Sequence, residues 1–492
     1  MQAVDGRIAL ATTKGRAILL TLCAVAFLDF VDASITNVAL PHIRDALGFS
    51  VQGLQWVPSG YLLTYGGFML LGGRLADLLG RRRVLIAGTV LVGLSSLVGG
   101  FAGSAAVFVG ARLAQGLGAA LMLPSALAML TTTFTAAKDR RTALGVWGAV
   151  AGLSSAAGIL LGGILAEGPG WRWVMFVNPI ACLLIIPAVL AALPAGRSRG
   201  LGSGFDALGG ALLTGGMLLL VFALVKAPDQ GWDAPATWLE LAGAAVLLTG
   251  FVRNERLVAK PILPLDIFKV RGLAAANVTG LIGFGGMLAM FFFLTLYMQY
   301  VLGYRPVAAG AAYLPLTFGV GISSGVGAKL MERFGSRATV SAGAVIAAAG
   351  LLLLARVPVG GSYVSDILPG ILLMSLGIGP VFVGVSSAAN AGVAPDRAGL
   401  AAAIMTSTQQ VGGGLGLAVL SAVGTARTTH LLAAGAAAGA ASAGGIRWAL
   451  FVGGLFALCA AVVALRLPDI REPAGEAQAG DARPEPATAE SR

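Results

Sequence analysis

The apolar runs of this chain constrain its fold more than any other feature. Fourteen stretches of about 17 to 27 residues carry few or no charges, and a helix needs about 20 mostly apolar residues to cross a bilayer. Only 11% of the 492 residues are charged, against about 25% in soluble proteins, so the chain lacks the polar groups to cover a water-facing surface. We therefore expect an all-α integral membrane protein. The stretches lie at about 17–40, 53–76, 84–103, 106–131, 142–165, 173–193, 206–226, 237–253, 273–298, 307–330, 338–356, 366–389, 399–425 and 447–467.

The basic residues orient these spans, because loops that stay in the cytoplasm retain Lys and Arg. With the N-terminus placed inside, 25 of the 33 basic residues fall on the inner side, 7 fall on the outer side, and Arg112 lies within a span. The sequence therefore predicts a multi-pass protein of the inner (plasma) membrane with both termini in the cytoplasm. This distribution accounts for the net charge of +11, so we expect no nucleic-acid partner.

Two polar breaks divide the chain into units. A break rich in Gly, Ser and Arg follows the sixth span, and a second one at 253–271 follows the eighth. We expect a six-helix bundle at 1–195, a linker with two accessory helices at 196–265, and a second six-helix bundle at 266–467. The tail at 468–492 is rich in Ala, Glu and Pro without apolar periodicity, so we expect it to be disordered in the cytoplasm.

A short motif recurs in the two bundles. Residues 73–83 and 328–337 match at an offset of 255, with an acidic residue three positions before an expected turn glycine, Gly80 or Gly335, and a basic residue two positions after it. Transporters are commonly built from internal repeats, with the substrate site where the halves meet. The motif therefore predicts two related bundles around a common site.

Three charged residues inside the first bundle are candidates for chemistry. An ionised carboxylate at mid-bilayer costs roughly 2.5–3.5 kcal/mol, so such groups are rare and usually face a cavity. Asp29 and Asp32 are three positions apart on one helix face, and two carboxylates this close in a low dielectric favour a state in which one keeps a proton. We expect at least one to carry the proton or a cationic substrate; the alternative is a structural partner for Arg112, whose buried guanidinium needs a carboxylate or carbonyls.

Four segments carry a recognisable pattern. Residues 73–83 contain Gly-x-x-x-Asp-x-x-Gly-Arg, and residues 112–120 read Arg-Leu-Ala-Gln-Gly-Leu-Gly-Ala-Ala. Residues 32–41 read Asp-Ala-Ser-Ile-Thr-Asn-Val-Ala-Leu-Pro, and residues 171–179 read Trp-Arg-Trp-Val-Met-Phe-Val-Asn-Pro. Over nearly its whole length the chain resembles the major facilitator superfamily, specifically its fourteen-span drug:proton antiporters of the multidrug and quaternary-ammonium exporter type. The resemblance implies the major facilitator fold, with two six-helix bundles and two additional transmembrane helices.

The resemblance also implies roles for particular residues. Proton coupling is expected at Asp29, Asp32 and Arg112, with the arginine changing partners as a nearby carboxyl gains or loses its proton. In the fifth span the family pattern Gly-Pro-x-x-Gly-Gly appears with Ile159 in place of proline, and the antiporter-type glycines are Gly158, Gly162 and Gly163. The predicted cytoplasmic gate motif consists of Gly73, Asp77, Gly80, Arg81 and Arg82. The predicted substrate-cavity residues are Asn37, Trp56, Tyr61, Gln115, Asn277, Tyr297, Gln299, Gln409 and Gln410.

Patterns of enzymes and metal sites lack their required context. Residues 321–325 match the Gly-x-Ser-x-Gly nucleophile elbow, but they lie in a helix-length apolar run. His42 and His430 have no partner at metal or catalytic spacing, and the three cysteines lie in separate spans. No Gly-x-x-x-x-Gly-Lys-Ser/Thr loop is present, so nucleotide hydrolysis does not drive transport. We expect no enzymatic activity, no metal and no cofactor.

The expected function is proton-coupled efflux of hydrophobic or cationic drugs by alternating access. An alternative function is also open: a protein of the same fold could export an endogenous metabolite, a self-made antibiotic or a lipid. A membrane acyl- or glycosyltransferase would need clustered acids and histidines at one membrane face, and the sequence has none. A channel is disfavoured by the repeat and by the uneven distribution of polar residues between the halves. The expected partners are a drug-like amphipathic or cationic molecule, protons and membrane lipids, for a monomeric protein.

Overall fold

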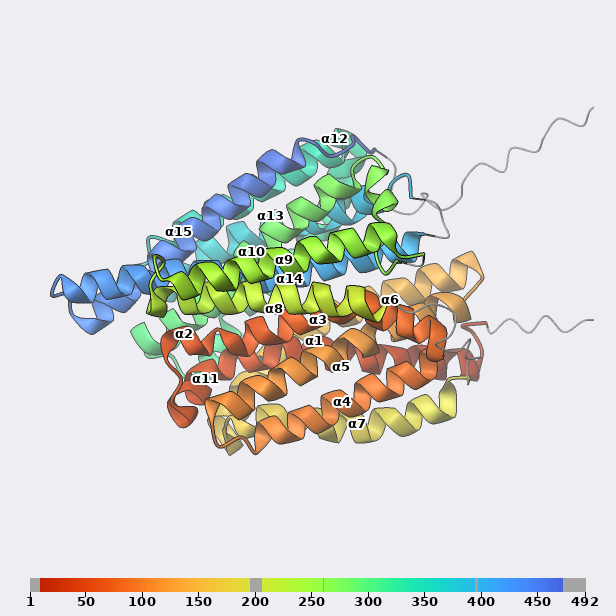
Figure 1. The fold of residues 1–492 in the computed structure, drawn as a ribbon, viewed down its shortest axis with the longest axis horizontal. Helices are drawn as coiled ribbons and strands as arrows, with labels where there is room; N and C mark the ends of the chain where they lie inside the picture. Colours follow the sequence, from red (N-terminus) through yellow and green to blue (C-terminus); the bar gives the residue numbers. More distant parts are fainter. Residues whose placement is uncertain (1–8, 195–205, 260, 394–396, 472–492) are drawn as a thin grey trace, which may run out of the picture.

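The computed structural model describes residues 9–194, 206–259, 261–393 and 397–471, and every regular element in these ranges is a helix. The long helices run roughly side by side (Figure 1). Ten helical segments of the described chain are long and apolar enough to cross a membrane. The all-helical membrane architecture is thereby confirmed, whereas the count of fourteen spans stays a prediction. The break expected at 195–204 lies outside the described residues.

The first bundle is formed by the N-terminal helices, and most of them begin or end at residues suited to that position. Thr12 Oγ1 accepts a hydrogen bond from the backbone N of Gly15 at 3.0 Å, and Ser104 Oγ accepts one from the backbone N of Val107 at 3.4 Å, so each satisfies an N–H of a first helical turn. The helices are α1 (Thr13–Leu47), the short α2 (Val51–Leu54), α3 (Trp56–Leu79), α4 (Arg81–Gly100), α5 (Ala105–Thr133), α6 (Ala137–Leu165) and α7 (Arg172–Ala192).

The second bundle follows the linker pair. The pair consists of α8 (Ala207–Gln230) and α9 (Pro235–Leu257), and it is fastened near Asp206, whose side chain caps α8 and accepts a hydrogen bond from the Asn254 amide at 2.6 Å. The second bundle consists of α10 (Leu273–Leu296), the short α11 (Pro306–Ala311), α12 (Leu314–Leu354), α13 (Leu368–Asn390), α14 (Ala398–Ala433) and α15 (Ala438–Ala464).

The repeated motif forms a glycine turn in each bundle. Gly80 separates α3 from α4 with φ 98°, and Gly335 interrupts α12 with φ 80°. Residues other than glycine rarely adopt a positive φ, so both positions need glycine. The turn predicted at Gly80 is confirmed. The helix α12 therefore consists of two segments that meet at Gly335. These two segments correspond to two of the predicted spans.

The end of the described chain packs on the second of these turns. Ser336 donates a hydrogen bond from its backbone N to the Ile470 carbonyl at 2.9 Å and from its Oγ to the Pro468 carbonyl at 2.5 Å. The expectation of disorder from residue 468 onward is therefore wrong for residues 468–471, because a neighbouring turn supplies partners for their backbone. The remainder of the predicted tail lies outside the described residues.

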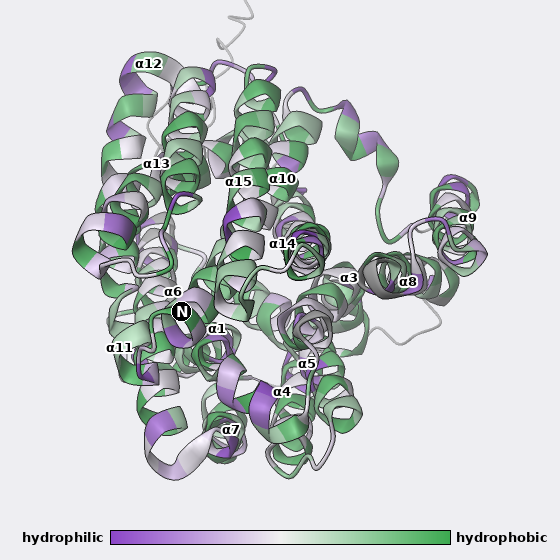
Figure 2. Cartoon of the chain, turned by 90° about the vertical axis from the view of Figure 1, so that its left-hand side faces the viewer, coloured by the Kyte–Doolittle hydropathy of each residue, from purple (hydrophilic) through white to green (hydrophobic). Residues whose placement is uncertain are grey.

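The two bundles meet along α3 and α14, and the accessory pair covers this seam. Ser59 Oγ donates to the Gly414 carbonyl at 3.4 Å, and Ser407 Oγ donates to the Gly66 carbonyl. Helix α8 packs against both α3 and α14, where Leu63, Val221 and Ala418 form a small apolar cluster. Figure 2 shows α8 beside α3 and α14, with α9 on its outer side.

The bundles also meet at the ends of α1 and α6 that are predicted to face outward. A Cβ placed on Gly163 would lie 2.8 Å from the Pro306 carbonyl, so α6 and α11 are in close contact there. Gln299 donates from Nε2 to the Val38 carbonyl of α1 at 2.8 Å. Earlier in α6, at Gly148, a Cβ would meet no neighbouring atom within 4 Å. On this side of the molecule these contacts between the bundles lie at the predicted outer end.

Candidate functional site

A buried polar network lies inside the first bundle, where five helices meet. α1 contributes two carboxylates, α3 two tyrosines, α5 an arginine and a glutamine, α4 a serine and α7 an asparagine. Each of these side chains is at most 3% exposed. The members of this polar network are Asp29, Asp32, Tyr61, Tyr65, Ser96, Arg112, Gln115 and Asn178.

Arg112 and Asp32 form an ion pair that ties α5 to α1. Arg112 Nη1 lies 3.0 Å from Asp32 Oδ2. The same guanidinium donates to Gln115 Oε1 at 2.8 Å and to the Val57 carbonyl at 3.3 Å, and its carbon lies 4.3 Å from the centre of the Tyr61 ring. A buried guanidinium needs a carboxylate or carbonyls, and these contacts supply both.

The other oxygen of Asp32 is held by two amides. Gln115 Nε2 donates to Asp32 Oδ1 at 3.3 Å, and Asn178 Nδ2 donates to the same oxygen. Both amides also reach Ser96 Oγ, at 2.5 Å from Gln115 and 3.2 Å from Asn178. Both oxygens of Asp32 therefore have donors, an arrangement that suits an ionised carboxylate.

Asp29 lies one helical turn away in a different environment. Its Oδ2 accepts a hydrogen bond from the Tyr65 hydroxyl at 3.0 Å. Its Oδ1 is buried and has no hydrogen-bond donor among the described residues. An ionised carboxylate in this position leaves a poorly compensated buried charge, and uptake of a proton removes that charge.

The charges of the network do not balance when both carboxylates are ionised. The network contains two carboxylates and one guanidinium, so it then carries one net negative charge, which a single proton neutralises. Because Arg112 is already engaged by Asp32, that proton is better accommodated on Asp29. The tyrosines lie between Asp29 and Arg112, since Tyr65 donates to Asp29, the Tyr61 ring lies against the guanidinium, and the two rings pack edge to face with centres 5.6 Å apart.

The predicted gate motif makes its described hydrogen bonds within the first bundle. Arg81 donates to Asp77 Oδ1 from Nε at 3.1 Å and from Nη2 at 2.9 Å, and to Thr132 Oγ1 of α5 at 2.9 Å. Arg82 donates to the Leu190 carbonyl of α7 at 2.7 Å. In this conformation the hydrogen bonds of the motif therefore link α3, α4, α5 and α7. Gly73 lies in α3, where a Cβ would come within 3.9 Å of Pro124.

The three glycines of the fifth span lie at helix contacts. A Cβ on Gly158 or Gly162 would overlap atoms of α1, and Gly163 faces α11 of the second bundle. Close backbone approach of this kind is the common use of small residues between membrane helices. Helix α6 runs from Ala137 to Leu165 without interruption at Ile159.

The cavity residues predicted in the first bundle occupy different places. Tyr61 and Gln115 belong to the polar network. Asn37 donates a hydrogen bond to a carbonyl of its own helix at 3.2 Å. Trp56 packs against Phe222 of α8, with ring centres 6.3 Å apart, so it contacts the accessory pair.

The cavity residues predicted in the second bundle are not gathered at one point. The Tyr297 hydroxyl donates to the Pro358 carbonyl at 2.5 Å, and Gln299 takes part in the contact with α1 described above. Asn277 is buried on α10 and donates to the carbonyl four residues earlier at 2.8 Å. Gln409 is buried and Gln410 is half-buried on α14.

Sequence reasoning missed some members of the network. Tyr65 follows Tyr61 by one helical turn, and that spacing on an apolar helix is a signal that could have found it. Ser96 has no comparable signal, because serine is common within membrane helices. Gln55, at the start of α3, is fully buried and neither atom of its amide has a partner among the described residues. The described part of the chain contains no cluster of three or more potential metal ligands.

Comparison with known proteins places this geometry in a family context. The sequence description of the Major Facilitator Superfamily matches residues 22–417. The puromycin resistance protein of Streptomyces alboniger is 38% identical over 480 residues, which cover 95% of this chain and 94% of the relative. The cephamycin export protein of Amycolatopsis lactamdurans is 38% identical over 428 residues, covering 85% and 86% of the two chains. A multidrug resistance protein of Mycobacterium tuberculosis, strain H37Rv, is 34% identical over 409 residues, covering 82% and 75%.

Solved structures share the fold at low sequence identity. A bacterial homologue of the human lysosomal transporter Spinster, in an inward-facing and occupied conformation, has a TM-score of 0.66 at 16% identity, covering 92% of this chain and 97% of that one. A peptide transporter in complex with sulfate also has a TM-score of 0.66, at 14% identity, covering 95% and 97%. These likenesses confirm the predicted fold class.

Proposed function

The chain belongs to the major facilitator superfamily, and on this premise we propose that it is a fourteen-span secondary transporter that exports hydrophobic or cationic drugs in exchange for protons. The observation that carries the proposal is the unequal environment of the two buried carboxyl groups. Asp32 is ion-paired with Arg112, whereas Asp29 has one oxygen without a donor. The proton-coupling site proposed here is therefore Asp29, supported by Asp32 and Arg112.

The charge of the polar network supplies a mechanism for exchange. With Asp29 ionised the network carries one net negative charge and favours a cationic or electron-poor substrate nearby. With Asp29 protonated the network is neutral and that attraction is lost. Proton and cationic substrate then compete for one state of the protein, and such reciprocal coupling is what antiport requires.

The contacts between the bundles support a particular conformation. Close approach of α6 to α11 and of Gln299 to α1 occurs at the end predicted to face outward. We assign this arrangement to an inward-facing state of an alternating-access cycle, with both termini cytoplasmic. In a variant without the native cysteines, a cysteine introduced at position 480 should then resist labelling from outside intact cells, and efficient labelling would reverse the orientation.

A second candidate function is favoured by the names of the relatives. One is named for puromycin resistance and another for cephamycin export. The same fold and coupling site in this chain would then export a self-made antibiotic or related metabolite. Transport of such antibiotics without transport of cationic dyes would favour this alternative.

The proposal is tested by transport in proteoliposomes that contain the purified full-length protein. A lipophilic cationic dye should accumulate in the lumen when the lumen is acidic, and should only equilibrate when no pH gradient is imposed. Accumulation that does not respond to the gradient would contradict proton exchange.

The accessory pair is expected to affect folding more than substrate choice, because no charged residue lies near the middle of α8 or α9. Val221→Ala removes apolar contact at the seam covered by α8 and should lower the amount of folded protein severalfold. The relative transport rates of several dyes should stay unchanged. Leu239→Ala on α9, where the side chain is 75% exposed, is the matched control. Fluorescence-detected gel filtration and dye efflux measure the two effects, and altered relative rates in the Val221 variant would argue against an accessory role.

A further inference from the structure

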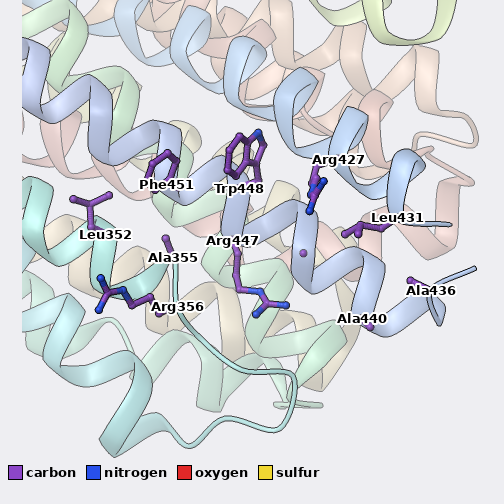
Figure 3. A pocket seen from close by; sticks show the side chains of 11 residues that line it. Leu352, Ala355, Arg356, Arg427, Leu431, Ala436, Ala440, Arg447, Trp448 and Phe451 are labelled. Carbon is purple, nitrogen blue, oxygen red and sulfur yellow. The ribbon is translucent and has the colours of Figure 1, made fainter. Parts of the chain in front are cut away.

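Three arginines surround a pocket of about 660 Å³ at the predicted outer end of the second bundle. Arg356 follows the end of α12, Arg427 lies on α14 and Arg447 lies on α15. Figure 3 shows Arg447 between Arg356 and Arg427 along the pocket, with Trp448 and Phe451 along one side. These positions account for three of the seven basic residues that the sequence assigns to the outer side.

The positive charge of this pocket is not compensated within the described part of the chain. No side-chain ion pair or side-chain hydrogen bond is formed by any of the three arginines among the described residues, and no carboxylate lines the pocket. Asp366, the acidic residue after α12, instead accepts hydrogen bonds from the Ser362 backbone N at 2.7 Å and from Ser365 Oγ at 2.9 Å. Three arginines that line one pocket without an acidic neighbour in its lining favour an anion, and the planar fork of donors of a guanidinium suits a phosphate.

The walls of the pocket are apolar. Trp448 and Phe451 stack with ring centres 5.3 Å apart and are 47% and 37% exposed. Leu352 of α12 and Leu431 of α14 add aliphatic surface. A small soluble anion would leave this surface unused, whereas an amphiphile can place its charged group at the arginines and its hydrocarbon against the rings.

The pocket also lies at the level where a membrane surface is expected. The α14–α15 hairpin extends beyond the other helices in Figure 1, and Arg427 and Arg447 lie near its base, close to the predicted ends of their spans. A neighbouring pocket of about 430 Å³ shares Arg427 and Trp448 and adds Trp232 from the α8–α9 loop. Tryptophan is enriched at membrane–water interfaces, so two exposed tryptophans on separate elements mark this level.

From this geometry we propose that the pocket bounded by Arg356, Arg427 and Arg447 binds an anionic phospholipid of the outer leaflet. The lipid headgroup lies in the part of the pocket that the arginines line, and an acyl chain lies along Trp448 and Phe451. The bound lipid compensates the gathered positive charge and supports the base of the α14–α15 hairpin. This site is separate from the polar network of the first bundle and does not depend on the proposed transport activity.

Native mass spectrometry of the delipidated full-length protein tests the site by titration with dioleoylphosphatidylglycerol. Wild-type protein should bind this lipid in preference to dioleoylphosphatidylcholine. Each basic residue near a membrane surface contributes about 1 kcal/mol to anionic lipid binding, so the triple variant Arg356→Gln/Arg427→Gln/Arg447→Gln should bind roughly a hundredfold more weakly. A matched variant, Lys329→Gln/Arg333→Gln/Arg466→Gln, removes the same charge from exposed positions at the other end of the bundle and should bind like wild type.

Two further arms separate the alternatives. Glycerol phosphate should not displace the lipid at equal concentration; displacement would assign the pocket to a soluble phosphate and overturn the lipid proposal, as would tight binding by the triple variant. Phosphatidylglycerol with brominated acyl chains should quench tryptophan fluorescence in wild-type protein and clearly less in Trp448→Phe, a variant that keeps an aromatic ring. Equal quenching in both proteins would place the lipid elsewhere.

Discussion

Asp29→Asn is expected to abolish gradient-driven efflux while binding of a neutral substrate survives. Asparagine has nearly the size of aspartate and can still accept a hydrogen bond from the Tyr65 hydroxyl, which lies 3.0 Å from Asp29 Oδ2. It cannot gain or lose a proton at physiological pH. The polar network should then remain neutral throughout the cycle, so the proton gradient no longer changes the affinity for substrate. Uphill transport should fall to background, and the affinity for a neutral substrate should stay close to the wild-type value, because a molecule without charge does not depend on the ionisation of Asp29.

Dye uptake into energised inverted vesicles measures this effect, and equilibrium binding in detergent measures the retained affinity. Asp233→Asn removes an exposed carboxylate from the α8–α9 loop and is the matched control, with efflux expected at the wild-type level. Efflux by Asp29→Asn at the wild-type rate would remove Asp29 from the coupling site. The proton would then have to be carried by an acidic residue outside the polar network.

The ion pair between Asp32 and Arg112 is expected to be the most costly polar contact to break in the first bundle. Both side chains are at most 2% exposed, so Arg112→Ala leaves a buried carboxylate without its countercharge. Breaking a buried pair in this way costs about 3–5 kcal/mol of stability. Arg112→Lys keeps the charge but cannot reach Asp32, Gln115 and the Val57 carbonyl together, so it should impair coupling nearly as strongly.

Thermal unfolding in detergent, followed by gel filtration, measures the loss of stability. The double variant Asp32→Asn/Arg112→Gln has no buried charge at the pair and should recover part of the stability lost in Arg112→Ala. Arg305→Gln is the control, because Arg305 is 79% exposed in its ion pair with Glu167 and an exposed pair is worth about 0–1 kcal/mol. If Arg112→Ala unfolds at the same temperature as Arg305→Gln, the buried ion pair does not stabilise the folded protein.

The helices and the charged members of the site could be predicted because each depends on a local or energetic signal. Long apolar runs predict the helices, and the repeated glycine motif predicts the turns at Gly80 and Gly335. A charged side chain in an apolar run costs free energy on insertion into a membrane, and such residues are therefore rare. For this reason the sequence identifies Asp29, Asp32 and Arg112. Their gathering in one buried network is a finding of the structure.

The partners of these charges could not be predicted with the same certainty. Asp29 and Asp32 share one helix face, so spacing alone does not decide which of them meets Arg112; the answer depends on how α5 packs against α1. Tyr65 and Ser96 belong to the network, yet tyrosine and serine are ordinary within membrane helices. The position of α8 across the α3–α14 seam depends on contacts between segments distant in sequence, which apolar periodicity does not specify.

Substrate-induced proton release from the detergent-solubilised protein tests the coupling site most directly, because it requires neither a membrane nor a gradient. Addition of a lipophilic cation such as tetraphenylphosphonium to wild-type protein in weakly buffered solution should acidify the solution, as the bound cation displaces the proton from Asp29. The network of the Asp29→Asn/Asp32→Asn variant carries the positive charge of Arg112, so this variant should bind the cation more weakly and should release no protons even at saturating cation. Asp233→Asn should release as many protons as wild type. Undiminished release by the double variant would contradict proton coupling through the Asp29 and Asp32 network.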